Sequence, residues 1–531
     1  MTSPLTTRAP TLQIDADVLV IGGGLAGTWA AVAAAREGAH VVLAEKGFCG
    51  TSGVTATAGP GHWWVPPDQR QAAIDKRIAS AAGLGDAHWM ARILETTWQT
   101  LPSLDRLYRF PENPQGEKQY RALRGPEYMR AMRQLALEHG VTLLDHSPAL
   151  ELLKNGNGEL AGARGLQRQQ QREWLVRAPA VVLSTGGCAF HSRLLGSQNN
   201  TGDGYLMGVE AGAELSGMEF SSYYCIAPAG STMTRSMVYT FGRYFDASGR
   251  ELPISQGPDF NESLARALLE GPVYCRLDRI PHDIRARLPY VQPNLMLPFD
   301  RLGIDPYRDK FAVTLHGEGT VRGVGGLRLV GEHCQTRLPG LFAAGDAASR
   351  EKVTGAVSGG GAVNSSWALS SGQWAGRGAA LHARQHPLRT RRTYGTARVG
   401  LLPLGDDRQG SSDLVNTVQN EMHPYDKNLF RTGAQLQRSL AELDNSWDRL
   451  REQRGARDPA AQLRWRETAA MLASARWCYG SALERKESRG IHQRSDVPQQ
   501  LATFDLHLLS GGLDTPWVRR DPLQAQAQVP A

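Results

Sequence analysis

Residues 18–27 of this chain, Val-Leu-Val-Ile-Gly-Gly-Gly-Leu-Ala-Gly, combine an apolar strand with a glycine-rich turn. An alanine-rich segment, Thr28 to Arg36, follows directly and predicts a helix. Gly22, Gly24 and Gly27 occupy the glycine positions of the GxGxxG pattern. The first permits a tight turn, the second lets a pyrophosphate approach the backbone, and the third allows a helix to pack closely on a strand. The segment therefore predicts the first half of a dinucleotide-binding unit.

A second apolar strand completes this unit. Residues 40–44 read His-Val-Val-Leu-Ala and lead to Glu45, 18 residues after Gly27. An acid at this distance accepts hydrogen bonds from an adenosine ribose. A GxGxxG pattern alone is a weak signal, and its alternative is an ordinary glycine-rich turn. Within a complete strand–helix–strand unit that ends in an acid, the pattern predicts a dinucleotide site on a parallel sheet.

Length and composition limit the class of protein. A chain of 531 residues is long enough for two or three domains. Its 41% hydrophobic and 21% charged residues are ordinary for a globular protein. No run approaches the ~20 apolar residues that span a bilayer, and residues 1–15 lack the basic and then apolar layout of a secretory signal. We expect a cytoplasmic protein without membrane insertion.

The net charge and the cysteine spacing limit the kinds of partner and cofactor that this chain can bind. The net charge is +7, and basic residues cluster at 389–392 and 519–520 without interleaved aromatic residues. We expect these clusters to be solvated, with an anionic partner as the alternative, and we expect no nucleic-acid site. The six cysteines show no CxxC spacing, which argues against a metal site or an iron–sulfur cluster held by this chain alone. Electron transfer would therefore need an organic cofactor or a separate protein.

Three later segments help to decide between NAD and FAD. Residues 180–183 form another apolar strand, which ends at a Ser-Thr-Gly-Gly turn. Residues 338–347 combine a strand with a glycine and then Asp346. An acid at such a strand end can accept hydrogen bonds from the ribityl hydroxyls of FAD, which NAD lacks. The glycine-rich turn at 358–361 then opens a long helix, whose free N–H groups and positive dipole end suit the electron-rich edge of a reduced flavin.

Taken in order, these segments resemble the flavoprotein subunits of the succinate dehydrogenase and fumarate reductase superfamily, which includes L-aspartate oxidase and adenylylsulfate reductase. Two C-terminal stretches extend the resemblance. Residues 428–433 read Asn-Leu-Phe-Arg-Thr-Gly, and residues 482–494 are similar to the family signature ARKESRGAHxR. The resemblance covers residues 16 to about 498, and it implies that the cofactor is FAD.

The resemblance implies an α/β fold with a Rossmann-like FAD-binding domain, an inserted α+β capping domain and a C-terminal helical domain. We expect the FAD-binding domain at 1–219 and 325–390, the cap at 220–324, the helical domain at 400–498 and a tail at 499–531. The residues expected to bind the cofactor are Gly22, Gly24, Leu25, Ala26, Gly27, Glu45, Lys46, Thr51, Ser52, Gly53, Thr185, Gly186, Asp203, Gly345, Asp346, Asn364, Ser365 and Ser366.

The resemblance also implies four side chains that this chain lacks. In the family, two histidines and an arginine hold a dicarboxylate, and a second arginine relays a proton. The matching positions here are Ser221, Val321, Gly360 and Asn261. None of them supplies a cation or a proton relay, so we expect that succinate, fumarate and aspartate are not substrates. The histidine that links flavin covalently in succinate dehydrogenases is matched by Gly53, so FAD is expected to be non-covalent.

Several residues near these positions are candidate substrate contacts. His62, Trp63 and Trp64 directly follow the segment expected to contact the flavin. Two adjacent indoles suit a planar substrate, and packing beneath the cap is the alternative. Ser221 occupies a position that contacts substrate in the family, so it is also a candidate.

Four residues are candidate acid–base or cationic groups. Tyr223 and Tyr224 are adjacent, and because strand side chains alternate between faces, only one is expected to point inward. His316 lies just upstream of the lost histidine, and Arg322 occupies the family's tyrosine position beside it. A structural or surface role is the alternative for each. Arg350, which follows the glycine–aspartate turn, is expected to pair within a loop.

The expected function is an FAD-dependent oxidoreductase that moves a hydride between a substrate C–H or C–N bond and flavin N5. Oxidation of the substrate is favoured over its reduction. The substrate is expected to be less anionic than a dicarboxylate, larger and partly planar. Two alternatives remain: a flavoprotein subunit that exchanges electrons with an iron–sulfur protein, and a flavin-binding protein without turnover. A homo-oligomer is an open option.

Overall fold

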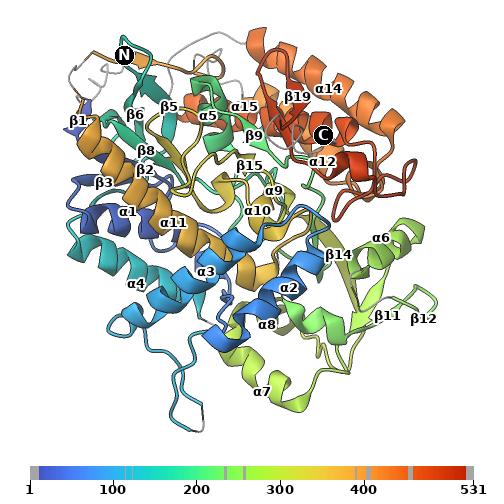
Figure 1. Ribbon diagram of the computed structural model, residues 1–531. Helices are drawn as coiled ribbons and strands as arrows, with labels where there is room; N and C mark the ends of the chain where they lie inside the picture. Colours follow the sequence, from blue (N-terminus) through green and yellow to red (C-terminus); the bar gives the residue numbers. More distant parts are fainter. Residues whose placement is uncertain are drawn as a thin grey trace, which may run out of the picture.

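A five-stranded parallel sheet carries the glycine-rich turn (Figure 1). Its strand order is β16-β8-β2-β3-β4. The three central strands are buried along their whole length, because helices cover the sheet and only apolar side chains fit there. The strands are β2 (Val18–Ile21), β3 (Val41–Ala44), β4 (Thr142–Leu144), β8 (Ala180–Leu183) and β16 (Leu341–Ala343).

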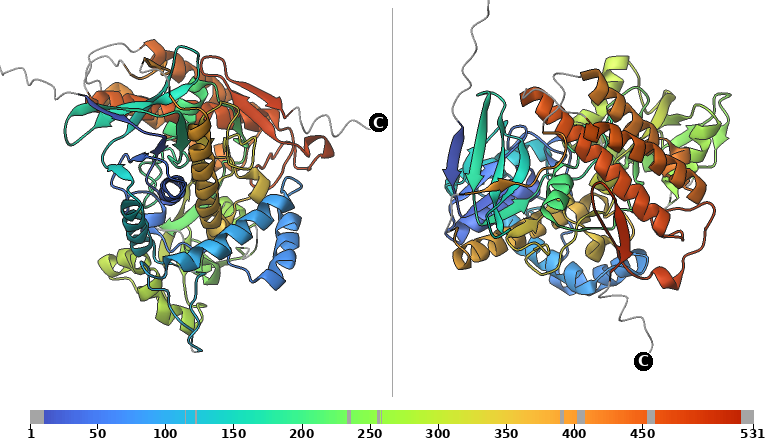
Figure 2. Two further views of the ribbon diagram at one scale, coloured as in Figure 1. Left: turned by 60° about the vertical axis from the view of Figure 1, so that its left-hand side comes forward. Right: turned by 90° about the horizontal axis from the view of Figure 1, so that it is seen from above.

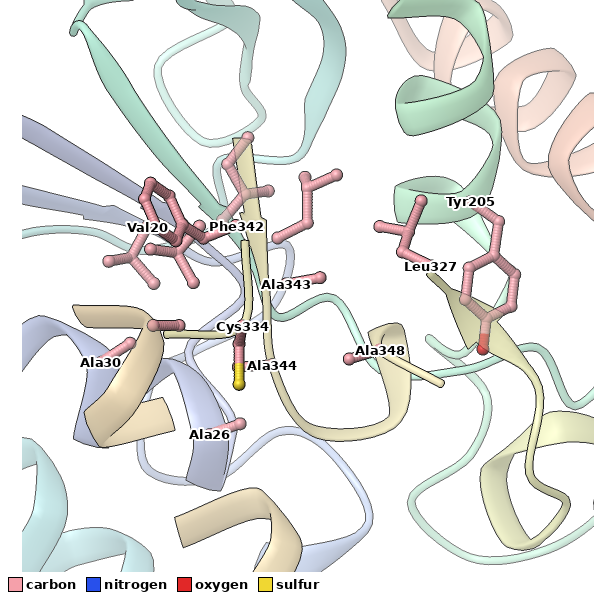
Figure 3. Packing of buried hydrophobic residues seen from close by; sticks show 14 of the residues in the cluster. Val20, Ala26, Ala30, Tyr205, Leu327, Cys334, Phe342, Ala343, Ala344 and Ala348 are labelled. Atoms are coloured by element: carbon pink, nitrogen blue, oxygen red, sulfur yellow. The ribbon is translucent and has the colours of Figure 1, made fainter. Parts of the chain in front are cut away.

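Helices α1 (Leu25–Arg36) and α11 (Gly360–Gln385) pack against each other beside this sheet (Figures 1 and 2). Their approach is close because glycines stand where the backbones meet. A Cβ atom at Gly372 or Gly376 would overlap the backbone of α1 at Ala26 or Ala30. Figure 3 shows the same core from close by, with Ala26 and Ala30 facing Val20, Phe342 and Ala343 of the sheet, and with Tyr205 and Leu327 nearby.

A second sheet, ordered β1-β7-β6-β5-β17, lies beside the first. Its β1–β7 pair is parallel and its other pairs are antiparallel. Its strands are β1 (Leu12–Asp15), β5 (Ala149–Lys154), β6 (Leu160–Gln167), β7 (Arg172–Arg177) and β17 (Tyr394–Gly395). The helices that pack around the two sheets are α2 (Arg70–Ser80), α3 (Ala87–Thr100), α4 (Gly125–Glu138), α5 (Asp203–Ala211), α9 (Gly319–Arg322) and α10 (Glu351–Thr354).

The segment expected to form the cap contains an antiparallel sheet ordered β10-β14-β13-β11-β12. It has a hydrophobic cluster of its own, which includes Tyr239, Leu264 and Phe299. In Figure 1 this part lies at the lower right, in yellow-green. Its elements are β10 (Tyr224–Pro228), β11 (Arg243–Phe245), β12 (Glu251–Leu252), β13 (Tyr274–Arg276), β14 (Phe311–Gly317), α6 (Phe260–Glu270), α7 (His282–Val291) and α8 (Pro293–Leu302).

Four helices follow towards the C-terminus, and a small sheet ordered β15-β9-β18-β19 packs against them. The expectation of a loop or tail after residue 498 is wrong for β18 and β19, because buried Leu508 and Leu509 pair this segment with β9. The elements are β9 (Leu215–Ser216), β15 (Gly326–Leu327), β18 (Leu508–Gly511), β19 (Trp517–Arg520), α12 (Arg408–Met422), α13 (Tyr425–Asn428), α14 (Gly433–Glu452) and α15 (Pro459–Glu484).

The structure is a computed structural model that describes residues 11–113, 115–121, 123–232, 236–254, 257, 259–388, 392–401, 408–452 and 459–521. Part of the basic cluster at 389–392, the first ten residues and the segment 522–531 lie outside these ranges. None of the helices formed by the described residues combines the length and apolar character needed to cross a membrane.

Candidate active site: two cavities that share a wall

The glycine-rich turn borders a cavity of about 890 Å³, counting space open to solvent. Gly22 has a φ of +103°, which a side chain would strain, and it lies against the backbone of Ser184. A Cβ at Gly27 would overlap the carbonyl of Gly22, so this glycine allows the helix to pack on the turn. Gly24 has no atom within 4 Å of its Cβ position, so the backbone there is open to a ligand. These are the three roles expected of the pattern.

Glu45 lines this cavity and is almost fully buried. Its carboxylate accepts hydrogen bonds from the backbone N–H of Gly23 (2.5 Å) and Gly47 (2.6 Å) and from Ser52 Oγ (2.8 Å). These bonds fix its orientation. A carboxylate has about four acceptor positions, so Glu45 retains capacity for a ribose hydroxyl.

Lys46 also borders the cavity, but two carboxylates neutralise it. Its Nζ lies 2.7 Å from Asp203 and 2.7 Å from Glu467 of α15, and it donates to Thr201 Oγ1 at 2.8 Å. Burial opposes the charged form of Lys46, yet the two carboxylates outweigh it and hold its pKa above the usual range. No local sequence pattern links Glu467 to Lys46, so this partner was not predicted.

Gly345 and Asp346 also line the cavity. Gly345 has a φ of +63° and donates its N–H to Ser371 Oγ at 3.0 Å. The Asp346 carboxylate pairs with Arg350, whose guanidinium is 1% exposed. Arg350 also donates to the carbonyls of Thr320 (3.0 Å) and Val321 (2.7 Å), so it ties the acid to α9.

Two buried amides support a cofactor at this place. Asn200 Oδ1 and both side-chain amide atoms of Asn364 have no hydrogen-bond partner among the described residues. Asn200 lines the nucleotide cavity and Asn364 lines the neighbouring one. Buried polar atoms are normally satisfied, and the polar edges of a flavin nucleotide provide such partners. The open glycine turn, the carboxylates of Glu45 and Asp346 and these amides fit FAD.

Most residues expected to bind the cofactor line the two cavities. Asn364 and Ser365 line the second cavity, whereas Gly27, Thr51 and Ser366 line neither. Thr51 donates to the carbonyl of Phe48, and Ser366 Oγ accepts from the N–H of Trp63 at 2.8 Å. The others line the first: Gly22, Gly24, Leu25, Ala26, Glu45, Lys46, Ser52, Gly53, Thr185, Gly186, Asp203, Gly345 and Asp346.

The second cavity, which we call the substrate cavity, holds about 1650 Å³ including space open to solvent. It shares Val54, Thr55, Asp346 and Ala368 with the nucleotide cavity. Its remaining wall comes from β10, the N-termini of α6 and α11, the end of α9, and the segments around residues 58–61, 121, 236–240 and 292. A ligand in this cavity would therefore contact residues that also line the nucleotide cavity.

Three of the four positions that lack the family's side chains line the substrate cavity: Asn261, Val321 and Gly360. The Asn261 amide donates to the carbonyl of Tyr224 at 2.9 Å. Gly360 has no atom within 4 Å of its Cβ position. Ser221, the fourth, is buried outside the cavity wall, and Arg431 Nη2 donates to its hydroxyl at 3.3 Å.

Tyr223 and Arg322 line the substrate cavity together. Arg322 Nη2 donates to the Tyr223 hydroxyl at 3.2 Å, and its guanidinium lies 4.8 Å from the centre of the phenol ring. Burial works against the charge on Arg322, yet Tyr223 and then Glu318 more than offset it and hold the pKa of Arg322 above its usual value. The pair thus combines a permanent cation with a group that can donate or accept a proton.

The other two candidate acid–base residues lie differently. His316 is absent from the wall of either cavity, and its Nε2 lies 3.2 Å from the carbonyl of Ser231. Burial lowers its pKa. Tyr224 borders the substrate cavity, but its hydroxyl donates to the carbonyl of His423 at 3.0 Å, and burial raises its pKa. Tyr223 is therefore the better placed of the two tyrosines.

The structure places His62, Trp63 and Trp64 outside the cavity wall. Trp64 stacks on Trp98 with ring centres 4.2 Å apart. His62 is fully buried, and burial lowers its pKa to about 3. Trp64 fits the packing alternative, because Trp98 on α3 supplies its partner surface, and Trp63 packs against the main hydrophobic core. Arg121 lines the substrate cavity. It was not predicted, because it lies in a segment without a recognisable motif.

Comparison with known proteins finds two family models that match this chain. A family model described as FAD dependent oxidoreductase matches residues 17–193, and one described as Fumarate reductase flavoprotein C-term matches residues 416–521. L-aspartate oxidase of Streptomyces coelicolor is 28% identical, over 93% of this chain and 90% of that protein. One subunit of the fumarate reductase (CoM/CoB) of Methanothermobacter marburgensis is 23% identical, over 91% of this chain and 95% of that protein.

Solved structures share the fold over almost the whole chain. FrdA of the E. coli quinol fumarate reductase superposes with a TM-score of 0.82 at 20% identity, covering 96% of this chain and 97% of that one. An adenosine-5-phosphosulfate reductase superposes with a TM-score of 0.75 at 18% identity, covering 97% and 96%. The family model and the relatives identify an FAD-dependent oxidoreductase. The two family models and the relatives support assignment to the flavoprotein superfamily of succinate dehydrogenases and fumarate reductases.

Proposed function

We propose that this oxidoreductase moves a hydride between a C–H or C–N bond of an organic substrate and non-covalently bound FAD, and that the substrate is not succinate, fumarate or aspartate. One observation carries the proposal: Asn261, Val321 and Gly360 line the substrate cavity without contributing a charge. A buried carboxylate needs a charged or strongly donating partner. A dicarboxylate held at these three positions would need such partners there, and this chain has uncharged groups; the lining arginines, Arg121 and Arg322, stand at other places in the wall.

The expected cofactor contacts follow from the cavity walls. Glu45 would hold the ribose of the adenosine, and Asp346 would hold the ribityl chain. The N-terminus of α11, at Gly360 and Gly361, would face the flavin ring with its positive dipole end, although the N–H of Gly360 donates to Ser358 Oγ at 3.3 Å. FAD supplies the acceptor and donor of the hydride. Gly53 carries no side chain that could form a covalent link, which supports non-covalent binding.

Tyr223 would move the proton in this reaction, and Arg322 would hold the phenol in place. The two side chains border the cavity, and a guanidinium hydrogen-bonded to a phenol oxygen stabilises negative charge there. Positioned acid–base groups contribute about 10²- to 10⁴-fold to rate. Tyr223→Phe should therefore lower the rate of flavin reduction by that factor with FAD still bound, whereas Tyr224→Phe should leave the rate within about threefold.

Anaerobic reduction of the bound flavin tests the proposal. The holoprotein would be mixed with succinate, L-aspartate and a panel of amines, other amino acids, alcohols and cyclic ketones, and the flavin absorbance band followed. We expect a member of the panel to bleach the flavin while succinate and L-aspartate do not. Rapid bleaching by either dicarboxylate, or rapid reoxidation of the reduced flavin by fumarate, would refute the exclusion.

A second candidate function is a flavoprotein subunit that exchanges electrons with an iron–sulfur protein. It is favoured by the relative from Methanothermobacter, which is itself one subunit of a fumarate reductase. Bleaching by dithionite but by no compound of the panel, together with co-purification of a brown protein, would support this candidate. Rapid reoxidation of the isolated chain by air would count against it. A homo-oligomeric state and a cytoplasmic location remain predictions.

A further inference from the structure

The charged groups of the substrate cavity are unbalanced. Among its described lining residues, Arg121 and Arg322 are basic and Asp346 is the single acid. Asp346 is already paired with Arg350, a buried arginine outside this cavity wall. Arg121 therefore has no lining carboxylate to offset it, whereas Arg322 has the buried Glu318, outside the cavity wall, close enough to favour its charged form.

Arg322 has hydrogen-bonding capacity that the described residues do not use. A guanidinium carries five N–H donors, and the described contact is the bond from Nη2 to the Tyr223 hydroxyl. Its Nε is buried and has no partner among the described residues. A buried donor without an acceptor costs about 1–3 kcal/mol, more for a charged group. An anionic ligand in the cavity would remove this cost, because a carboxylate accepts from a guanidinium in bidentate fashion.

Arg121 contributes a second cation from a different part of the chain. Its carbonyl accepts from the N–H of His62 at 2.7 Å, which fixes the segment beside Gly61 of the cavity wall. Arg121 is exposed, and no ion pair joins it to another described residue. An exposed cation at the rim attracts anions and raises their local concentration, whereas Arg322 lies within the wall.

The rest of the wall is largely apolar or aromatic. It includes Pro60, Ile226, Tyr239 and Phe260. These side chains offer a surface for a hydrophobic body. The lining thus combines one buried guanidinium with an apolar chamber.

We propose that the substrate cavity binds an organic monocarboxylate with an apolar body, whose carboxylate is held by Arg322 and attracted by Arg121. The apolar body would lie against Tyr239 and Phe260. This inference rests on the proposed function, since it assumes that the ligand is not a dicarboxylate. It adds the charge of the substrate and names the residues that select for it.

The test uses pairs of probes that differ only in charge. The FAD-loaded protein would be titrated with 3-phenylpropionate and hexanoate and with their neutral amides, and binding followed by the change in the spectrum of the oxidised flavin. We expect each carboxylate to bind at least tenfold more tightly than its amide. Arg322→Gln should abolish most of this preference with the amide affinity unchanged, and Arg322→Lys should retain part of it.

A matched control separates a specific effect from a general loss of positive charge. Arg121→Gln should weaken carboxylate binding by about three- to tenfold, more at low ionic strength. Arg124→Gln, three residues further along, should change nothing, because Arg124 is exposed and pairs with Glu127 at 3.2 Å. The FAD content of each variant would be measured first, so that loss of the cofactor is not mistaken for loss of ligand binding.

Three outcomes would overturn the inference: equal affinity for carboxylate and amide, an unchanged preference in Arg322→Gln, or no spectral change with any probe at millimolar concentration. The titration needs no turnover, so its result is independent of the reduction experiment. Bleaching by succinate would refute the proposed function, whereas these outcomes refute only the charge selectivity assigned here.

Discussion

Replacing Arg350 with methionine removes a buried cation that holds two parts of the active site together. The side chain is 1% exposed and pairs with Asp346, and it donates to the carbonyls of Thr320, Val321 and Gly323. Removing one partner of a buried ion pair costs about 3–5 kcal/mol, because the other charge is left without compensation. We therefore expect Arg350→Met to lose about 3–5 kcal/mol of unfolding free energy.

Urea unfolding of the FAD-loaded protein at a fixed FAD concentration would measure this loss, with release of flavin as the signal. Arg337→Met is the matched control. Arg337 is 60% exposed and lies 3.7 Å from Glu214, so its removal should cost less than about 1 kcal/mol. Arg350→Lys keeps the charge without the fork of donors and should fall between the two. A loss for Arg350→Met no larger than that for Arg337→Met would refute the reasoning.

Three further predictions follow from buried groups described above. Burial lowers the pKa of His62 to about 3, so the folded protein keeps it neutral while the unfolded chain protonates it below about pH 6.5. Stability should therefore fall as pH decreases through this window. His62→Phe should reduce the slope of unfolding free energy against pH by about 1.4 kcal/mol per unit, and urea titrations that show an unchanged slope would contradict this. Lys46→Met leaves the carboxylates of Asp203 and Glu467 without their cation beside a negatively charged cofactor. Lys46→Met should weaken FAD binding at least tenfold, as measured by calorimetry of the apoprotein. The control Lys118→Met, at an exposed position, should leave the FAD affinity unchanged. Gly376→Ala places a methyl group against the backbone of Ala30 and should cost about 1–3 kcal/mol by overpacking. Gly156→Ala, at a position with no atom within 4 Å of the new Cβ, should not lower the unfolding free energy in this way. Equal stabilities of the two variants would argue against close contact of α1 and α11.

The nucleotide cavity was accessible from sequence because its geometry is local. Gly22, Gly24 and Gly27 are required by a turn of a few residues, and Glu45 follows at a distance set by one strand–helix–strand unit. The FAD cofactor, the fold class and the superfamily were all predicted from such segments and are confirmed. The individual site residues remain predictions.

The substrate cavity depended on contacts between distant segments, which the sequence pattern does not encode. Trp64 packs on Trp98, which lies on a later helix, and this contact takes the indole out of the cavity wall. Neither Arg121 nor Arg350 belongs to a sequence motif. Arg121 is identified by its place in the cavity wall, and Arg350 by the carbonyls to which it donates. The strands β18 and β19 were missed for the same reason, since their partner β9 lies far earlier in the chain.

The contact between Lys46 and Glu467 has a consequence for how the protein is made. The two residues are 421 positions apart, and a ribosome that adds about 5–20 residues per second needs about 20–80 s to cover that distance. During this interval the nascent nucleotide-binding unit has emerged, but one of the two carboxylates that neutralise its lysine has not been synthesised. We expect tight capture of FAD to come late, after α15 has left the ribosome, so that cofactor loading reports completion of the chain.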